Sequence, residues 1–279
     1  LNYKNLHLYL FNHSTIFLMP TKLHIVGIQA DLTWEDPIKN LAFFEKKIHA
    51  LHKEADLIVL PEMFPSGFTM HPKNIAEKMT GNTVLWMQRM GRKQEIALVG
   101  SIVIEENKNY YNRLLFVHPS GKIEWYDKRH SFTLAGEEKV YTAGSEKLIV
   151  KFKGWKICPL ICYDLRFPVW SRNAENYDVL IYVANWPVSR IQAWKTLLKA
   201  RAMENMSYTI GVNRIGIDAN KYEYSGDSLI LNCLGEELSA LKKNENGIIK
   251  ATLVKTEQER IRERLGFLND RDAFKIKIL

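Results

Sequence analysis

A short apolar run that ends in a cysteine is the feature that most constrains this chain. Residues 157–161 (Ile-Cys-Pro-Leu-Ile) predict a buried strand, and Cys162 follows them directly. A Tyr, an Asp, an Arg and a Pro come shortly afterwards, which is typical of a loop that leads into a helix. Open α/β proteins place their chemistry at the carboxyl ends of such strands. Cys162 is therefore either a reactive thiol at a strand end or a buried structural cysteine, and this stretch alone leaves both open.

Similar apolar runs alternate with segments of helical spacing along most of the chain. Strands are predicted at 23–28, 56–60, 97–104, 111–118, 123–126, 157–161, 179–183, 209–213, 228–231 and 248–253. Helices are predicted at 36–54, 82–94, 168–176, 189–208 and 257–265, with Asp36 and Ser189 as N-terminal caps and Gly266 after the last. Hairpins at 98–118 and 225–235 make the sheets mixed. The two roughly similar halves predict an α/β sandwich of two sheets with helices outside.

The length of 279 residues and the absence of a linker favour one domain at 21–279. Residues 1–20 do not share the regular pattern and lack the features of a signal peptide. We interpret them as an N-terminal extension that is either not native or disordered, with Met19 as the natural start. A genuine amphipathic extension is the alternative.

Charge and cysteine usage exclude several kinds of partner. The net charge of +8 comes from Lys and Arg that are spread along the chain among Asp and Glu, so we expect no nucleic-acid partner. No apolar run approaches the roughly 18 residues of a membrane-spanning helix, so we expect no membrane association. Three cysteines without zinc-ligand spacing predict free thiols in a reducing compartment, and hence a cytoplasmic protein.

Three predicted strand ends carry groups that suit acyl transfer. Glu62 follows the strand at 56–60, Lys128 follows 123–126, and Cys162 follows 157–161. A thiol needs a base to become a nucleophile, and a carboxylate in a desolvated pocket can take its proton. A nearby lysine can stabilise the oxyanion that forms. Spacing alone does not decide, because Glu62 is equally a helix cap or surface acid, and Lys128 equally part of a solvated charge cluster.

The segments around these residues resemble the motifs of the nitrilase (carbon–nitrogen hydrolase) superfamily, and the resemblance extends from about residue 22 to 275. The matching segments are 61–64 (Pro-Glu-Met-Phe), 126–130 (Tyr-Asp-Lys-Arg-His) and 161–168 (Ile-Cys-Tyr-Asp-Leu-Arg-Phe-Pro), with further matches at 136–137, 185–187, 201–205, 212–214 and 224–228. The resemblance implies a four-layer α-β-β-α sandwich with two mixed sheets. It also implies a homodimer or larger homo-oligomer, for which the helix at 168–176 and the tail after Gly266 are the expected interface.

The same resemblance assigns roles to individual residues. It implies that Glu62 is the general base, Cys162 the nucleophile and Lys128 an oxyanion donor. The backbone N–H of Tyr163 is implied as a second oxyanion donor, and Glu137 as the residue that orients the lysine. No metal or organic cofactor is implied. From its position beside Glu62 and Lys128 we expect Cys162 to have a lowered pKa. His71, His118 and His130 are interpreted as surface or hydrogen-bonded histidines.

Within the superfamily the chain looks most like the ω-amidase branch, which deamidates small α-keto acid amides such as 2-oxoglutaramate and 2-oxosuccinamate. The form of the cysteine motif and the short segment 128–137 favour this branch, although segment 131–135 is shorter than in many members, which leaves substrate contacts there open. An N-carbamoyl amino acid hydrolase, a nitrilase and a non-catalytic interaction scaffold are the alternatives.

A substrate that carries a carboxylate needs a cation in the pocket. Arg166 is the first candidate and Arg129 the second, and a structural ion pair between Arg166 and Asp164 is the alternative. The aromatic side chains expected to form the pocket walls are Phe64, Phe132, Tyr163 and Trp186.

Overall fold

The computed structural model describes residues 21–51 and 54–277. The predicted N-terminal extension at residues 1–20 therefore lies outside the described residues. The described helices are all too short or too polar to cross a membrane.

The first sheet has six strands in the order β14-β1-β2-β3-β4-β5. Its first three strands in chain order run parallel, and β4, β5 and β14 add antiparallel strands at its two sides. The strands are β1 (Lys22–Gln29), β2 (Leu57–Val59), β3 (Ala97–Glu106), β4 (Asn109–Val117), β5 (Ile123–Asp127) and β14 (Gly247–Val254).

The second sheet repeats this plan in the order β13-β12-β9-β8-β7-β6. Strands β7, β8 and β9 are parallel, and their neighbours β6 and β12 pair with them antiparallel. The strands are β6 (Val150–Phe152), β7 (Trp155–Ile161), β8 (Val179–Ala184), β9 (Tyr208–Asn213), β12 (Leu229–Leu231) and β13 (Glu237–Ala240). A separate two-stranded ribbon is formed by β10 (Ile215–Ile217) and β11 (Glu223–Ser225).

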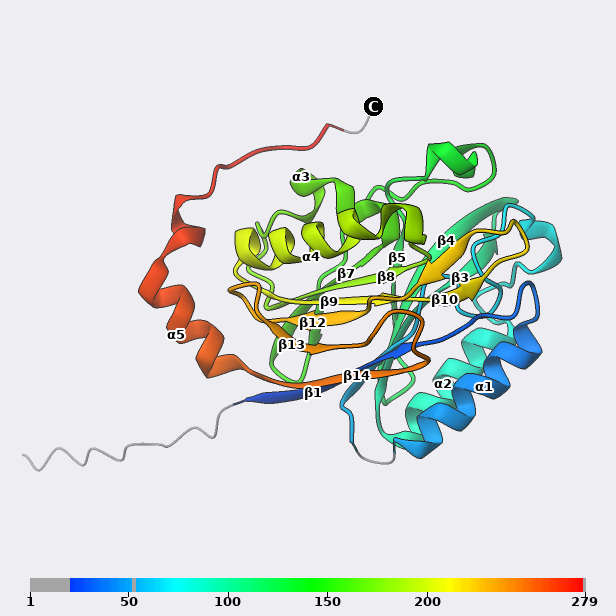
Figure 1. The fold of residues 1–279 in the computed structure, drawn as a ribbon, viewed down its shortest axis with the longest axis horizontal. Coiled ribbons are helices and arrows are strands. Elements are labelled where there is room, and N and C mark those ends of the chain that lie inside the picture. Colours follow the sequence, from blue (N-terminus) through cyan, green and yellow to red (C-terminus); the bar gives the residue numbers. More distant parts are fainter. Residues whose placement is uncertain (1–20, 52–53, 278–279) are drawn as a thin grey trace, which may run out of the picture.

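Helices cover the outer faces of the two sheets, so the prediction of a four-layer α-β-β-α sandwich is confirmed (Figure 1). The helices α1 and α2 lie on one outer face, and α3 and α4 lie on the other. The helix α5 follows β14 at one end of the sandwich, and the chain beyond it turns back toward the side of α3, where Arg271 donates to the backbone oxygen of Asn173 (Figure 1). The helices are α1 (Pro37–Ala50), α2 (Asn82–Gln94), α3 (Pro168–Ser171), α4 (Ile191–Asn205) and α5 (Lys255–Leu265).

The alternation of side chains along β1 and β2 explains how one sheet serves two cores. Leu23 and Ile25 point into the apolar layer between the two sheets, whereas Val26 and Ile28 point outward to α1 and α2. Each such fully buried side chain contributes about 1.5–3 kcal/mol. The sheets approach closely at Gly27, where a Cβ atom would lie 2.6 Å from Cγ2 of Val212. A larger residue at this position would force β1 away from β9.

Three predicted helices end at other residues than the sequence pattern indicates, and the first of them, predicted to reach residue 54, ends at Ala50. The helix expected at 168–176 is wrong beyond Ser171, because Asn173 accepts from the backbone N–H of Tyr177 and donates to its carbonyl, which fixes a loop instead. Ser189 does not cap α4, since it lies inside a 3₁₀ turn at Val188–Arg190 and makes no capping bond. The helix then ends at Asn205 because Met206 adopts a left-handed backbone (φ 48°).

The remaining differences concern short or irregular strands. The sequence pattern misses β6, β10, β11 and β13, none of which exceeds four residues. The second predicted hairpin is formed by β12 and β13 and turns at Gly235, which has a positive φ of 78°. Asp36 caps α1 as predicted, because its side chain accepts from the backbone N–H of Lys39 at 3.0 Å.

Candidate active site

Cys162 lies at the end of β7, where the chain leaves the sheet in a 3₁₀ turn (Cys162–Arg166). Its backbone is left-handed, with a φ of 42°, which is strained for a residue that has a Cβ atom. The buried carboxylate of Asp164 stabilises this turn, because it accepts from the N–H of Ile161 at 3.0 Å and from the hydroxyl of Tyr126 at 2.8 Å. The strained turn directs the thiol into a cavity at the carboxyl end of the strand.

Glu62 follows β2 and is completely buried, so it is neither a helix cap nor a surface acid. Its Oε1 accepts from Nζ of Lys128 and from Nδ2 of Asn112, both at 2.9 Å. Its Oε2 accepts from the backbone N–H of Asn185 at 2.8 Å. The next residue, Met63, has a left-handed φ of 43°, as Cys162 does. Both carboxylate oxygens are therefore fixed by donors from three separate strands or strand ends.

Lys128 follows β5 and bridges two carboxylates. Its ammonium donates to Glu62 at 2.9 Å and to both oxygens of Glu137 at 2.9 and 3.0 Å. Burial by itself lowers the pKa of Lys128, but the negative charges of Glu137 and Glu62 outweigh burial and raise it, so the side chain stays an ammonium. Burial raises the pKa of Glu137, and the charge of Glu62 raises it further, while Lys128 opposes both.

The thiol of Cys162 differs from the expected low-pKa nucleophile. Burial raises its pKa well above the ordinary value, and the negative charge of Glu62 adds to that rise, while Lys128 opposes it. The sulfur lies 3.9 Å from the backbone oxygen of Asn185. The prediction of a lowered pKa is therefore wrong, since a buried carboxylate beside the sulfur disfavours a second negative charge. The resting group is a neutral thiol with a proton acceptor next to it.

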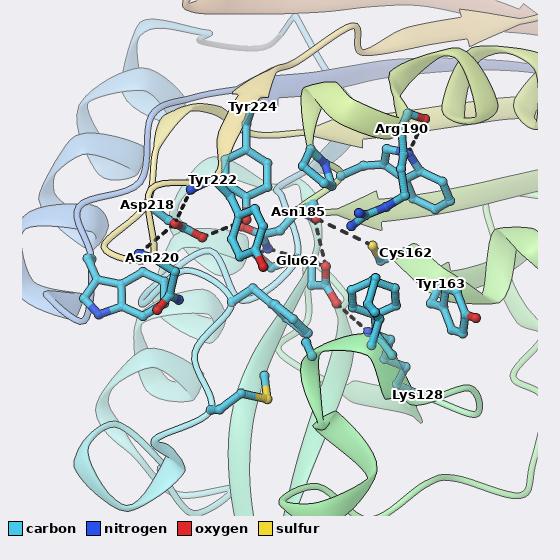
Figure 2. Close-up of a pocket in the computed structure, with 18 of the residues that line it drawn as sticks. Glu62, Lys128, Cys162, Tyr163, Asn185, Arg190, Asp218, Asn220, Tyr222 and Tyr224 are labelled. Carbon is cyan, nitrogen blue, oxygen red and sulfur yellow. Dashed lines mark hydrogen bonds and ion pairs between the residues drawn. The ribbon is translucent and has the colours of Figure 1, made fainter.

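These residues share one cavity of about 490 Å³. Figure 2 shows Glu62 between Lys128 and Asn185, with the sulfur of Cys162 beside them. A group of polar and aromatic residues lies at the other end of the cavity (Figure 2). The cavity is lined by Trp34, Glu62, Phe68, Met70, His71, Lys128, Phe132, Leu134, Ala135, Cys162, Tyr163, Arg166, Asn185, Trp186, Pro187, Arg190, Asp218, Asn220, Tyr222 and Tyr224.

Three of the four predicted wall residues line this cavity, namely Phe132, Tyr163 and Trp186. Phe132 and Tyr163 pack edge to face with ring centroids 5.0 Å apart. The fourth prediction is wrong, because Phe64 turns away from the cavity and is buried against α1 and α2, with its ring 5.4 Å from that of Phe44. The left-handed backbone of the preceding Met63 reverses the chain at this point and sends Phe64 into the outer core.

Of the two candidate cations, only one lines the cavity. Arg166 lines the cavity and lies over the ring of Trp186 at 5.0 Å. Asp164, the expected ion-pair partner of Arg166, instead accepts from the hydroxyl of Tyr126. Its carboxylate also lies 2.8 Å from Nδ1 of His130. Arg129 does not line the cavity, because its guanidinium donates to the carbonyl of Gly144 and lies over Trp170.

Sequence reasoning missed several residues of the site. Asn112, which donates to Glu62, is a polar residue inside the apolar strand β4, and this interruption was a signal. Arg190 and Asp218 lie outside the matching segments, so nothing in the pattern indicates them, whereas Tyr224 on β11 begins the matching segment 224–228, which was a signal. His71 lines the cavity, whereas His118 pairs with Glu124 outside it. In the described part of the chain, no three His, Cys, Asp or Glu side chains are grouped so that they could hold a metal ion.

Comparison with known proteins gives matches over nearly the whole described chain. The sequence model of a family described as "Carbon-nitrogen hydrolase" matches residues 25–262. The chain is 40% identical to "Omega-amidase YafV" of Escherichia coli (strain K12) over 254 residues, which covers 91% of this chain and 98% of that protein. It is 32% identical to "2-oxoglutaramate amidase" of Bacillus subtilis (strain 168), with 89% and 97% covered.

A solved structure also matches this chain over most of its length. It is the crystal structure of a CN-hydrolase superfamily protein from Xanthomonas campestris with an arsenic adduct in its active site. The TM-score is 0.90 at 37% sequence identity, and the match covers 92% of this chain and 99% of that one.

Proposed function

The chain belongs to the carbon–nitrogen hydrolase family, and we propose that it is an ω-amidase whose catalytic residues are Glu62, Lys128 and Cys162. It would hydrolyse the terminal amide of small α-keto acid amides, such as 2-oxoglutaramate and 2-oxosuccinamate, to the acid and ammonia. The observation that carries the proposal is the contact of one buried carboxylate with a lysine, beside a thiol at a strained strand end. The similarity to an ω-amidase and a 2-oxoglutaramate amidase supports the choice of substrate.

The first half of the reaction begins with a neutral thiol. Glu62 accepts the proton of Cys162 as the sulfur attacks the amide carbonyl, because a free thiolate beside Glu62 is disfavoured. The carbonyl oxygen becomes an oxyanion, which Lys128 and the backbone N–H of Tyr163 stabilise by about 3–4 kcal/mol per donor. Glu62 then returns the proton to the amide nitrogen. The carbon–nitrogen bond breaks, and ammonia leaves behind a thioester on Cys162.

The second half removes the acyl group with water. Glu62 takes a proton from a water molecule while the oxygen of that water attacks the carbonyl carbon of the thioester. The carbon–sulfur bond breaks, the carboxylic acid is released, and the sulfur recovers its proton from Glu62. In this scheme Glu137 holds Lys128 in place, supported by contacts of 2.9 and 3.0 Å with the ammonium. Arg166 and the aromatic rings of Phe132 and Trp186 bind the substrate.

The test is ammonia release from a panel of compounds, with Cys162→Ala as the control. The panel contains 2-oxoglutaramate, 2-oxosuccinamate, glutamine, asparagine, an N-carbamoyl amino acid and a simple nitrile. We expect release from the two keto-acid amides and loss of that release in the variant. Release confined to the carbamoyl compound or the nitrile would contradict the ω-amidase assignment and favour another hydrolase of the family.

Two further parts of the proposal concern the location of the catalytic domain in the chain and in the cell, and the oligomeric state. We propose that residues 21–279 form the catalytic domain and that the protein works in the cytoplasm, supported by three cysteines that are all free thiols in the structure. We also propose a homodimer or larger homo-oligomer that uses α3 and the C-terminal segment. Val169 on α3 is 54% exposed, and Phe267, Phe274 and Ile276 are 40–56% exposed. Light scattering of Phe274→Ser/Ile276→Ser would show a smaller mass than the wild type.

A further inference from the structure

Two guanidinium groups in the cavity wall carry charges that the protein does not neutralise. Arg166 lies over the ring of Trp186 and Arg190 lies over the ring of Phe132, each at 5.0 Å from the ring centroid. Across residues 21–51 and 54–277, no carboxylate forms an ion pair with either of them. Stacking on a ring face orients a guanidinium while leaving its N–H donors available.

Other cations in and around this region are paired, which makes the two arginines distinctive. Lys128 is held by two glutamates. Arg214, which lies over Tyr224 of the cavity wall, pairs with Asp31 at 2.9 Å. The one acid at the far end of the cavity, Asp218, accepts from the hydroxyl of Tyr224 and from two backbone N–H groups. The available positive charge of the cavity is therefore concentrated at Arg166 and Arg190.

Both arginines are tied to residues next to the thiol. The indole of Trp186 donates to the backbone oxygen of Arg190 at 2.8 Å, and Trp186 directly follows Asn185, whose oxygen lies 3.9 Å from the sulfur. Phe132, beneath Arg190, packs against Tyr163, which directly follows Cys162. Figure 2 shows Arg190 toward the Cys162 end of the cavity, away from Asp218 and Tyr222.

Unpaired guanidinium groups in the same cavity as the thiol suit a short molecule that reacts at one end and is anionic at the other. In a five-carbon acid amide, the amide carbon and the carboxylate carbon are roughly 5 Å apart when the chain is extended. A 2-oxo acid also presents its keto oxygen beside the carboxylate, so it offers hydrogen-bond acceptors to two guanidinium groups at once. A guanidinium binds such oxygens bidentately, which a single ammonium does not reproduce.

We infer that Arg190, together with Arg166, selects substrates by the carboxylate remote from the scissile amide, and that Arg190 is a specificity-determining residue of this site. The inference rests on the proposed amidase function and adds to it the source of selectivity for acids over neutral amides. Arg190 is half-buried whereas Arg166 is exposed. Loss of Arg190 therefore removes the better desolvated of the two charges, and its effect should be the larger.

The experiment compares two amides of equal chain length, glutaramate with a carboxylate and pentanamide without one, alongside 2-oxoglutaramate. Arg190→Met keeps a long side chain over Phe132 but removes the charge. Arg190→Lys keeps the charge but lacks the bidentate N–H donors of the guanidinium. Arg260→Met, on the exposed face of α5, removes an equal charge far from the cavity and serves as the matched control. Near-ultraviolet circular dichroism checks that each variant keeps the native fold.

We expect Arg190→Met to raise KM for both acid amides about 10- to 100-fold with kcat within about threefold, and to leave kcat/KM for pentanamide unchanged. Arg190→Lys should fall between, and Arg260→Met should match the wild type. An equal loss on pentanamide would overturn the inference, because it would mean that Arg190 only supports Phe132. A wild type that hydrolyses pentanamide as well as glutaramate would also overturn it, yet would leave the amidase proposal standing. A wild type that releases no ammonia from any amide would instead refute the proposed function.

Discussion

Replacing Lys128 with methionine should expose how strongly this site depends on one buried positive charge. In the wild type, the ammonium lies between Glu62 and Glu137, and all three side chains are at most 3% exposed. Methionine has a similar length and no charge, so the variant keeps most of the packing. It leaves two carboxylates, each at most 1% exposed, next to each other with no counter-ion.

The size of the effect follows from the charges. Two like charges roughly 5 Å apart repel by about 3 kcal/mol at an effective dielectric constant of about 20. Breaking a buried ion pair by removing one partner costs about 3–5 kcal/mol. The folded variant limits this cost by protonating one carboxylate, and Glu137 is the candidate because its pKa is already raised in the wild type. Loss of the ammonium, which lowers the pKa of Glu137 in the wild type, raises the folded-state pKa further above its unfolded value of about 4.3.

The sign of the pH dependence then follows. A carboxylate whose pKa is higher in the folded state binds more protons there, so stability decreases as pH rises from the unfolded pKa to the folded pKa. The loss of stability relative to the wild type should therefore be larger at pH 8 than at pH 5.5, and of the order of the about 3–5 kcal/mol that a broken buried ion pair costs. The double variant Lys128→Met/Glu137→Gln, which has one carboxylate fewer, should recover part of that loss at pH 8.

Urea unfolding followed by tryptophan fluorescence at pH 5.5 and pH 8 measures these losses, each against the wild type at the same pH. The kcat of Lys128→Met should also fall by about a hundredfold or more, since an oxyanion donor is lost. An equal loss of stability at both pH values would refute the electrostatic reasoning and would point to packing instead. If the double variant recovered no stability, the lost stability could not be attributed to repulsion between the two carboxylates.

Three further predictions test other parts of the site. Because burial raises the pKa of the Cys162 thiol, its alkylation by iodoacetamide, followed by peptide mass spectrometry, should still be accelerating at pH 9; a plateau below pH 7 would contradict this. Cys158 is fully buried and does not line the cavity, so it should react more slowly still. Phe64→Ala should cost about 3–5 kcal/mol of stability in urea unfolding and leave KM within about twofold, because this ring packs in the outer core. Tyr126→Phe should cost about 1–3 kcal/mol, since the buried Asp164 loses a hydroxyl donor at 2.8 Å; a loss below about 0.5 kcal/mol would count against that contact.

The repeating pattern of buried strands and amphipathic helices is strong enough to predict the layers of the fold. Leu23, Ile25, Val26 and Ile28 alternate between two cores, and apolar residues on both sides of one strand are what a central strand of a covered sheet requires. The same pattern does not predict where a helix stops. Asn173 ends α3 through two hydrogen bonds to Tyr177, and such side-chain bonds compete with the helix without changing the apolar spacing.

The candidate site divides in a similar way. The predicted strand ends single out Glu62, Lys128 and Cys162, but only the resemblance of their segments to the carbon–nitrogen hydrolase motifs assigns them roles. The structure places all three at one cavity. The direction of a side chain beyond a strand end depends on one backbone angle, so Phe64 was misplaced when Met63 adopted a left-handed backbone. The pKa of Cys162 was misjudged because burial, which the sequence does not report, outweighs the attraction of Lys128. Arg190 was missed because a long side chain in a loop has no periodic pattern.

The bonds that position the reacting groups run between the two sheets. Glu62 follows a strand of the first sheet, but its Oε2 is held by the N–H of Asn185, which follows β8 of the second. In the opposite sense, the hydroxyl of Tyr126 on β5 stabilises the turn of Cys162 through Asp164. Each sheet therefore completes the site of the other, and neither could hold a reactive geometry alone. Loosening the apolar layer between the sheets should reduce kcat before it unfolds the chain, because hydrogen-bond geometry is lost over smaller displacements than hydrophobic contact.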